Sequence, residues 1–337
     1  MTPSKRQIAA TRAVVEWYRA THHGSVDDVG LVGTFCSVAK VGAFAASRDA
    51  LERGDDDDLF KLLVTVAMFQ RLRDALVMNI LRGISVSDAT ELTSIDALAR
   101  LARRSPCDHA RSNRSLLGVC DLGKDEDGRG RCSVAPEIAC HLKRHTVLLK
   151  RYGHFGKMPT SAALAVGERG GGLGRLRRDV LQSTPDPLER AQALGARLSE
   201  IWRVSDKLSS MFLSLVCAPR MGLSSPPWQE GVDWTWFVVV DRNVDLFLSS
   251  IGYSGSGTYD ARRTFVRELA ARVDLSSIDA EWPAFHPRLV QQAMYLFMST
   301  SNRRDASGDC LHLAKCSRCP QALSSRCPVR ASSSGPS

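Results

Sequence analysis

Four cysteines lie within eighteen residues near the end of the chain, in the spacing C-x5-C-x2-C-x7-C. A C-x2-C pair lets one turn of backbone present two sulfur atoms to one metal, and the outer cysteines can complete a four-thiolate cage. Spacing this tight is specific for metal binding, and an iron–sulfur cluster or zinc would fit it. The candidate ligands are Cys310, Cys316, Cys319 and Cys327.

Composition favours a folded protein of the cytoplasm. The chain has 337 residues, 44% hydrophobic and 24% charged, enough for one large core or two moderate ones. Charged residues interrupt residues 1–20 where a signal peptide needs an apolar run, and no apolar stretch is long enough for a membrane span. In a reducing compartment, ten cysteines indicate metal binding or chemistry rather than disulfides.

The net charge of +9, from 45 basic and 36 acidic residues, suits a polyanionic partner. Contacts to phosphates release counterions and give affinity that does not depend on sequence. Nucleic acid is therefore one expected partner, and well-solvated basic faces are the alternative explanation of the charge.

The apolar residues recur at helical spacing, and no stretch alternates long enough for a sheet, so we expect an all-α fold. Asp55–Asp58 suit the positive end of a helix that continues through a long apolar segment. The glycine-rich run at 167–178 lacks the Lys-Ser/Thr ending of a phosphate loop, and a mobile linker is the favoured interpretation. The expected helices cover 7–20, 59–81, 88–104, 138–152, 187–202, 206–217, 242–252, 260–273 and 284–300, with a loop-like insertion at about 105–137.

Three segments in fixed order carry a family resemblance: RVSDKLSSMFLS at 203–214, VVVDRNVDLFL at 238–248, and the cysteine loop. Together they resemble the endonuclease III-like helix-hairpin-helix DNA glycosylases. In that family a glycine hairpin leads into a helix with a catalytic lysine, a catalytic aspartate follows an apolar segment, and a C-terminal cysteine loop holds a [4Fe-4S] cluster. The similarity extends in weaker form over roughly 59–105 and 138–328.

The resemblance implies a two-lobed fold and a base-excision activity. Lys207 would be the nucleophile that attacks the sugar, and Asp241 would orient it, shuttle protons and stabilise the sugar cation. The partner would be double-stranded DNA with a damaged or modified base flipped out of the helix, bound by a monomer associated with the nucleoid. Singly, Lys207 also fits a solvated first-turn lysine, and Asp241 fits a helix N-cap.

The domains expected from the resemblance are N-terminal helices that pack with the cluster lobe, a barrel lobe that contains the hairpin and the insertion, a cluster lobe and a disordered tail. They cover residues 1–58, 59–240, 241–328 and 329–337.

The sequence departs from the family at the hairpin, where Arg203 and Ser205 stand in place of the two glycines of G-V-G. These two residues, with Gln70 and Arg71 at the end of the first barrel helix, are the expected DNA-binding residues. The cysteine spacings also differ from the usual C-x6-C-x2-C-x5-C. A non-catalytic iron–sulfur DNA-binding protein on the same scaffold is therefore an alternative, and a zinc-bound interaction module unrelated to DNA is another.

Four further cysteines lie in or beside the insertion, and a second metal site there, holding zinc, is a weaker hypothesis. Their spacings of twelve, eleven and seven residues include no C-x-x-C pair. They are Cys107, Cys120, Cys132 and Cys140.

Overall fold

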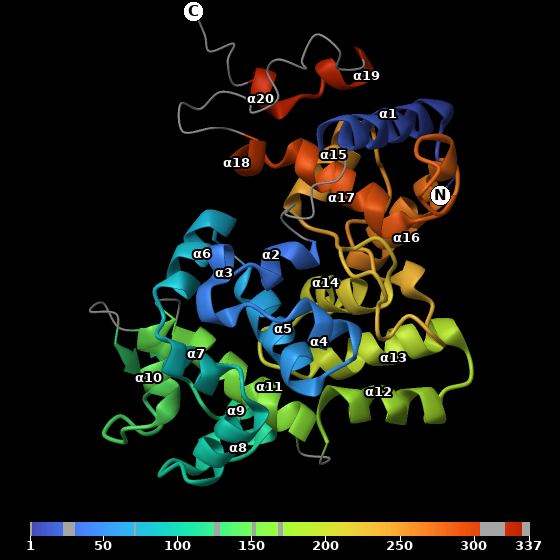
Figure 1. The fold of residues 1–337 in the computed structure, drawn as a ribbon. Coiled ribbons are helices and arrows are strands. Elements are labelled where there is room, and N and C mark those ends of the chain that lie inside the picture. Colours follow the sequence, from blue (N-terminus) through green and yellow to red (C-terminus); the bar gives the residue numbers. More distant parts are fainter. Residues whose placement is uncertain are drawn as a thin grey trace, which may run out of the picture. The chain divides into compact units, whose positions relative to one another are not determined.

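The structure is a computed structural model, and it describes residues 2–22, 31–70, 72–124, 129–149, 153–167, 171–303 and 321–331. Over these residues the chain is mostly helical, which confirms the all-α class (Figure 1). The chain forms two compact units, residues 1–30 with 234–337 and residues 31–233. No helix in the described ranges is long and apolar enough to cross a membrane.

The second unit, residues 31–233, is built around two helices that are buried along most of their length, α5 (Asp56–Met68) and α14 (Asp206–Cys217). They pack against each other, and α13 packs against α14. Its other helices are α2 (Val32–Cys36), α3 (Val38–Val41), η1 (Gly42–Phe44), α4 (Arg48–Glu52), α6 (Asp74–Arg82), α7 (Val86–Leu92), α8 (Ile95–Arg103), η2 (Asp108–Ala110), α9 (Asn113–Gly118), α10 (His141–Leu148), η3 (Gly153–Lys157), α11 (Met158–Gly167), α12 (Gly172–Ser183) and α13 (Pro187–Ser199). The insertion carries the two-residue antiparallel strands β1 (Gly123–Lys124) and β2 (Gly130–Arg131).

The first unit is centred on α17 (Pro287–Met298), where nearly every side chain is buried. Helices α1, α15 and α16 all pack against it and enclose one apolar core. The elements of this unit are α1 (Lys5–His22), η4 (Trp234–Trp236), α15 (Arg242–Ser250), α16 (Tyr259–Ala270), η5 (Leu275–Ser277), α17, α18 (Thr300–Arg303), α19 (Gln321–Ser324) and α20 (Pro328–Ala331).

The helix expected over 59–81 is wrong as one element, because α5 and α6 are separate helices. The predicted acidic start is present: the Asp55 side chain accepts from the first-turn amides as the N-cap. At the other end, Gln70 Nε2 donates to Ala67 O at 2.6 Å and to Arg203 O at 3.4 Å. The side chain thus satisfies a helix-end carbonyl where the backbone turns away.

The helix expected over 88–104 is likewise two helices, α7 and α8. Thr93 Oγ1 donates to Ala89 O at 2.8 Å where the first ends, and Ser94 Oγ accepts from Ala97 N at 3.2 Å where the second begins. Because Ser94 caps a new helix, the helical backbone is interrupted here, although the periodic apolar pattern of the sequence runs on without a gap.

The glycine-rich run at 167–178 is mainly helical, so the linker interpretation is wrong for its second half. Helix α12 begins at Gly172, and Gly174 N donates to Asp56 Oδ1 at 2.6 Å. A side chain at Gly172 would place its Cβ 2.8 Å from Asp56 Oδ2. Glycine therefore allows the start of α12 to pack against the acidic first turn of α5. Residues 168–170 of the run lie outside the described residues.

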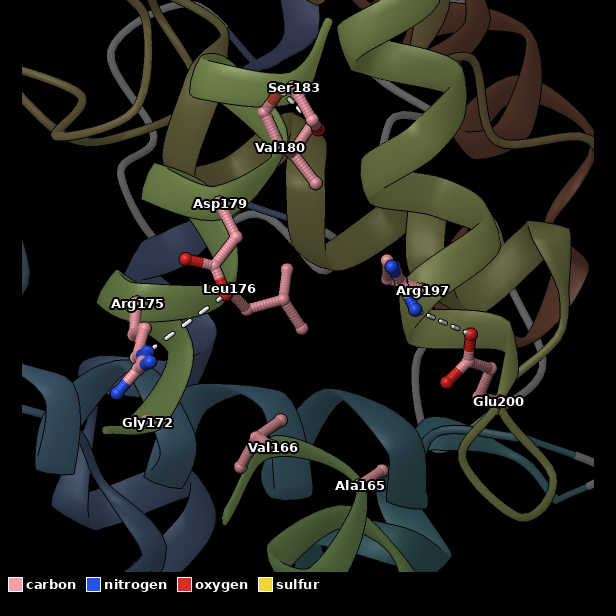
Figure 2. Close-up of a pocket in the computed structure, with 10 residues that line it drawn as sticks. All are labelled: Ala165, Val166, Gly172, Arg175, Leu176, Asp179, Val180, Ser183, Arg197 and Glu200. Atoms are coloured by element: carbon pink, nitrogen blue, oxygen red, sulfur yellow. Dashed lines mark hydrogen bonds and ion pairs between the residues drawn. The ribbon is translucent and has the colours of Figure 1, made fainter. Parts of the chain in front are cut away.

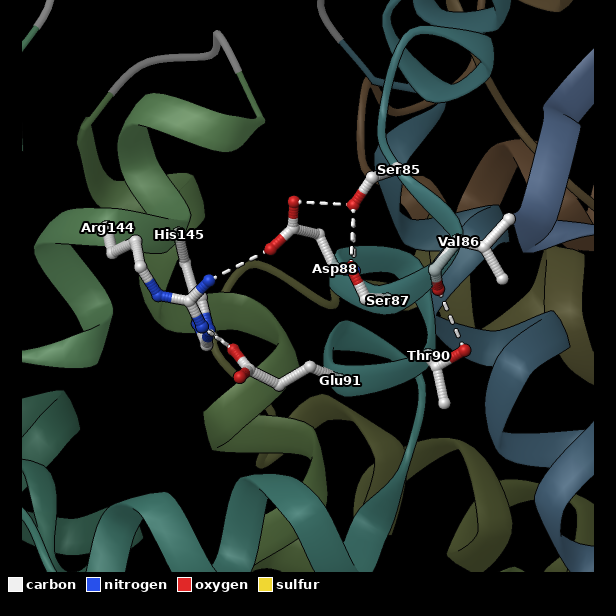
Figure 3. Close-up of polar contacts among 8 residues, drawn as sticks. All are labelled: Ser85, Val86, Ser87, Asp88, Thr90, Glu91, Arg144 and His145. Carbon is white, nitrogen blue, oxygen red and sulfur yellow. Dashed lines mark hydrogen bonds and ion pairs between the residues drawn. The ribbon is translucent and has the colours of Figure 1, made fainter.

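The helix after the insertion, α10, is tied to α7 by a charged cluster (Figure 3). Arg144 forms ion pairs with Asp88, at 3.0 Å, and with Glu91. His145 Nε2 lies 2.8 Å from Glu91 Oε1, and its ring is fully buried. Burial, followed by the neighbouring Arg144, lowers the pKa of His145 to about 3, so the imidazole is neutral at pH 7.

Candidate active site

Lys207 lies in the first turn of α14, one residue after the helix begins. Its side chain is half-buried, whereas the side chains from Leu208 onward are buried in the core of the second unit. Ser205 occupies the N-cap position in extended backbone, without a capping side-chain hydrogen bond. A rigid, buried helix therefore carries the candidate nucleophile at the end that is still open to solvent.

The turn before α14 contains one residue in a backbone conformation that favours glycine. Arg203 has φ 65, in the left-handed region that favours glycine, and it is one of two non-glycine residues with positive φ in the described ranges. The predicted hairpin would have a glycine at this position. Arg203 adopts a left-handed backbone that a glycine would adopt readily, and it adds a cationic side chain there.

The structure brings two of the expected DNA-binding residues together. The Gln70 amide reaches the backbone carbonyl of Arg203 and so joins the end of α5 to the hairpin. The Arg203 guanidinium lies 5.5 Å from the Trp202 ring centroid. Arg71 lies outside the described residues, so its predicted role stays a prediction.

A buried lysine that sequence reasoning missed lies behind the hairpin. Lys157 is 1% exposed, and its Nζ donates to Leu116 O at 3.2 Å and to Cys120 O at 2.5 Å. It also sits 3.6 Å above the Trp202 ring. Burial lowers the pKa of Lys157, but its enclosed position makes it a support for the hairpin rather than a nucleophile.

Asp241 is the N-cap of α15, as the sequence predicts. Its Oδ1 accepts from Val244 N at 2.9 Å. The segment before it is fixed by Tyr259, whose hydroxyl accepts from Val240 N at 3.2 Å and donates to Val238 O at 2.8 Å. Lys207 belongs to the second unit and Asp241 to the first, and their meeting in one active site is part of the proposal below.

Only Cys327 of the four expected cluster ligands is among the described residues. It is buried, and Arg303 Nη2 lies 3.6 Å from its Sγ. The Arg303 guanidinium is itself buried, with the rings of Trp17 and Phe297 at 4.9 and 5.0 Å. A buried cation beside the sulfur suits a thiolate ligand, because it compensates the negative charge.

The insertion cysteines come near one another without forming a ligand set. The Cys120 thiol interacts electrostatically with those of Cys132 and Cys140, and the Cys140 thiol with that of Cys107. Burial raises the pKa of Cys120 and of Cys140, so both favour the protonated form. Among the residues with described positions, no three or more His, Cys, Asp or Glu side chains are arranged to hold a metal ion. Zinc at these cysteines stays a prediction.

A cavity of about 200 Å³ opens in the second unit between α11, α12 and the end of α13 (Figure 2). Arg175 faces Asp179 along α12, and Arg197 faces Glu200 at the end of α13, so charged pairs line an apolar floor. Neither Lys207 nor a residue expected to bind DNA lines it. The cavity is therefore separate from the candidate active site.

Comparisons with protein-family models, with curated proteins and with solved structures found no match for the chain. The functional assignment accordingly depends on the residues and geometry described above.

Proposed function

We propose that this protein is a DNA glycosylase with associated abasic-site lyase activity, which excises a damaged or modified base from double-stranded DNA. The observation that carries the proposal is the left-handed turn at Arg203, directly before the helix that presents Lys207. A backbone held in this shape can bring its amides close to a DNA phosphate, and the lysine follows at the start of a rigid helix.

The chemistry uses the two candidate groups in different roles. The base is flipped out of the duplex, because a stacked base is out of reach. The neutral amine of Lys207 forms a bond to the anomeric carbon as the bond from that carbon to the base breaks, and the base leaves with a proton. Asp241 stabilises the positive charge that develops on the sugar and relays the protons. The bond from the anomeric carbon to the ring oxygen then breaks, and that oxygen takes the proton that the lysine nitrogen gives up, which yields the Schiff base. Elimination of the 3′ phosphate from this open-chain Schiff base cleaves the strand.

The implied cofactor is a [4Fe-4S] cluster, held by Cys310, Cys316, Cys319 and Cys327. Cys327 fits a thiolate ligand, because Arg303 supplies a buried positive charge at its sulfur. When bound, the cluster would stabilise the loop of residues 310–327 structurally. The net charge of +9 suits a monomer that acts on DNA in the cytoplasm, at the nucleoid.

Incubation with a panel of duplexes, each with one damaged base, tests the function. We expect base release and strand cleavage on at least one duplex, and loss of both in Lys207→Gln. Asp241→Asn should reduce base release at least about 100-fold, since it removes a charge that stabilises the transition state.

Arg203 and Ser205 in place of the hairpin glycines favour a second candidate, a non-catalytic DNA-binding protein on the same scaffold. Tight DNA binding without base release or strand cleavage on any duplex would support that candidate and contradict the enzyme. Absence of both binding and cleavage would contradict both.

A further inference from the structure

Two side chains from other helices bind the backbone of the turn at 200–205, between α13 and α14. Asn113 Nδ2 donates to Glu200 O at 3.1 Å, and the Ser161 hydroxyl accepts from Trp202 N at 2.8 Å. The two side chains are also bonded to each other, because Ser161 Oγ donates to Asn113 Oδ1 at 2.7 Å. One connected hydrogen-bond network thus holds a carbonyl and an amide of the turn.

The network is buried and includes the insertion. Asn113 begins α9, in the insertion, and is 7% exposed, whereas Ser161 lies within α11 and is fully buried. Helices α9 and α11 pack against each other. A buried polar group that loses its partner gains no water in exchange, so both side chains are constrained to the geometry observed. The insertion, over which the family resemblance does not extend, therefore reaches the backbone next to the candidate site.

The turn needs this support because the backbone of Arg203 is strained. At φ 65 a residue with a Cβ is less stable than in the ordinary helical or extended regions. Such a conformation persists only where the surrounding contacts determine it. The network fixes the amide of Trp202, directly before Arg203, and Gln70 binds the carbonyl of Arg203 itself. The chain is thus anchored before and after the rotation about φ.

The ring of Trp202 is attached to the insertion as well. Lys157 Nζ lies 3.6 Å from the ring centroid and donates to Leu116 O, in α9, at 3.2 Å. Helix α9 is therefore linked to the turn at Asn113 and, through Lys157, at Leu116. Because Lys207 stands in the first turn of the helix that follows, the position of the turn sets the position of the candidate nucleophile.

We propose that Asn113 and Ser161 are positioning residues that hold Arg203 in its left-handed conformation, and that DNA binds the turn in this form. The use of the turn for DNA rests on the proposed function, in which its amides approach a phosphate. The effect of the two side chains on the backbone does not depend on DNA, so it can be tested without a substrate.

NMR of the full-length chain, labelled at arginine, measures the backbone at Arg203 directly. A φ near 60° brings the amide and α protons of one residue closer together than a negative φ does, so it gives a strong nuclear Overhauser effect between them. The Arg203 signal is assigned by its loss in Arg203→Gly. In Ser161→Ala we expect this effect to weaken toward that of the helical arginines, because the released turn populates negative φ.

Thr160→Val is the matched control. Thr160 is the neighbouring residue of α11, and its buried hydroxyl has no hydrogen-bond partner among the described residues. Its removal should leave the Arg203 signal unchanged. A wild-type Overhauser effect in Ser161→Ala, with the near-UV circular dichroism unchanged, would overturn the proposal.

Asn113→Ala tests the network from its other end and covers the case in which Ser161→Ala does not fold. It removes the hydrogen bond to Glu200 O and the acceptor of the Ser161 hydroxyl. We expect the same weakening of the Arg203 signal, and a wild-type signal in this folded variant would also overturn the proposal.

Binding to duplex DNA with an abasic site measures the consequence for the site. Ser161→Ala should lower the affinity about fivefold to thirtyfold, since the left-handed form is depopulated by the strain that the network no longer opposes. Glycine adopts this conformation without strain, so in Arg203→Gly the same substitution should lower the affinity by no more than about threefold. A purely structural role predicts an equal loss in both backgrounds, and an equal loss, or none in either, would overturn the proposal.

The NMR measurement stands even if the wild-type chain binds no DNA. A left-handed signal that depends on Ser161, in a chain without affinity for DNA, would contradict the proposed function and leave the positioning role supported. Failure of the two proposals is therefore distinguishable.

Discussion

The left-handed backbone at Arg203 predicts an unusual order of stability among substitutions. At ordinary backbone angles, alanine is more stable than glycine by about 0.5–1 kcal/mol, because glycine loses more conformational entropy on folding. At φ 65 the order reverses, since a Cβ atom there costs roughly 1–2 kcal/mol and glycine has none. Arg203→Gly should therefore be more stable than Arg203→Ala by about 0.5–1 kcal/mol.

Both variants lose the contact between the guanidinium and the Trp202 ring, which contributes about 0.5 kcal/mol at a partly exposed site. Relative to wild type, Arg203→Ala should be destabilised by about that amount. Arg203→Gly, which lacks the contact but also the Cβ strain, should lie between equal stability and about 0.5 kcal/mol more stable.

Urea unfolding of the full-length variants, followed by circular dichroism, measures this order. The matched control is Arg178, an exposed arginine in the interior of α12, where glycine should be less stable than alanine by about 1 kcal/mol. Arg203→Ala more stable than Arg203→Gly would refute the hairpin geometry on which the proposed function rests.

Three other predictions concern the cofactor, packing and pH. Purified anaerobically, the chain should hold about four iron atoms and four sulfides, lost in Cys316→Ser and retained in Cys36→Ser, which changes a half-buried cysteine of α2 outside the proposed ligand set. Metal analysis that finds zinc instead of iron would contradict the cofactor. Gly156→Ala should lower the free energy of unfolding by about 1–3 kcal/mol, because the new Cβ would overlap Thr146 Oγ1 and the backbone carbonyl of Leu142. Gly195→Ala, where the new Cβ would meet open space, should instead raise the free energy of unfolding by about 0.5–1 kcal/mol. Urea unfolding that shows the same change in stability for both variants would contradict the close packing around Gly156. Burial lowers the pKa of His141 and His145 to about 3, so between pH 3 and about 6.5 the unfolded chain binds more protons than the folded chain. The free energy of unfolding should therefore fall as the pH is lowered through this window. A free energy of unfolding that does not change with pH there, or a pH dependence that His145→Gln leaves unaltered, would contradict the burial of neutral imidazoles.

Elements with local signals could be predicted from the sequence. The caps at Asp55 and Asp241 follow from an acidic residue placed before an apolar helical pattern, and both are present. The helices α13 and α14 follow from periodic apolar residues, and α13 also has Asp186 and Pro187 at its start. These signals lie within one or two turns of the elements they define.

Two of the errors arose where a distant residue contributes to the local structure. The break between α5 and α6 depends on Gln70, whose amide reaches a carbonyl 133 residues away. The helical start of the glycine-rich run depends on Asp56, 118 residues before the amide it binds. Neither contact can be predicted from periodicity, which reports only on neighbours along the chain.

The candidate catalytic residues could be predicted from the sequence, but the buried cations that pack behind the candidate site residues could not. Lys207 and Asp241 stand at helix starts, as their motifs imply. Lys157 and Arg303 carry no motif, and a lysine or arginine in a sequence is usually a surface residue. Their burial follows from packing between helices that are distant in sequence, which the structure was needed to define.

Covalent trapping tests the central claim most directly. The wild-type chain is incubated with duplex DNA that contains an abasic site, in the presence of borohydride, which reduces a lysine–sugar Schiff base to a stable adduct. We predict one protein–DNA adduct that is lost in Lys207→Ala and retained in Lys61→Ala, a lysine on α5. An adduct of equal yield in Lys207→Ala, or none in the wild type while DNA remains bound, would contradict the account.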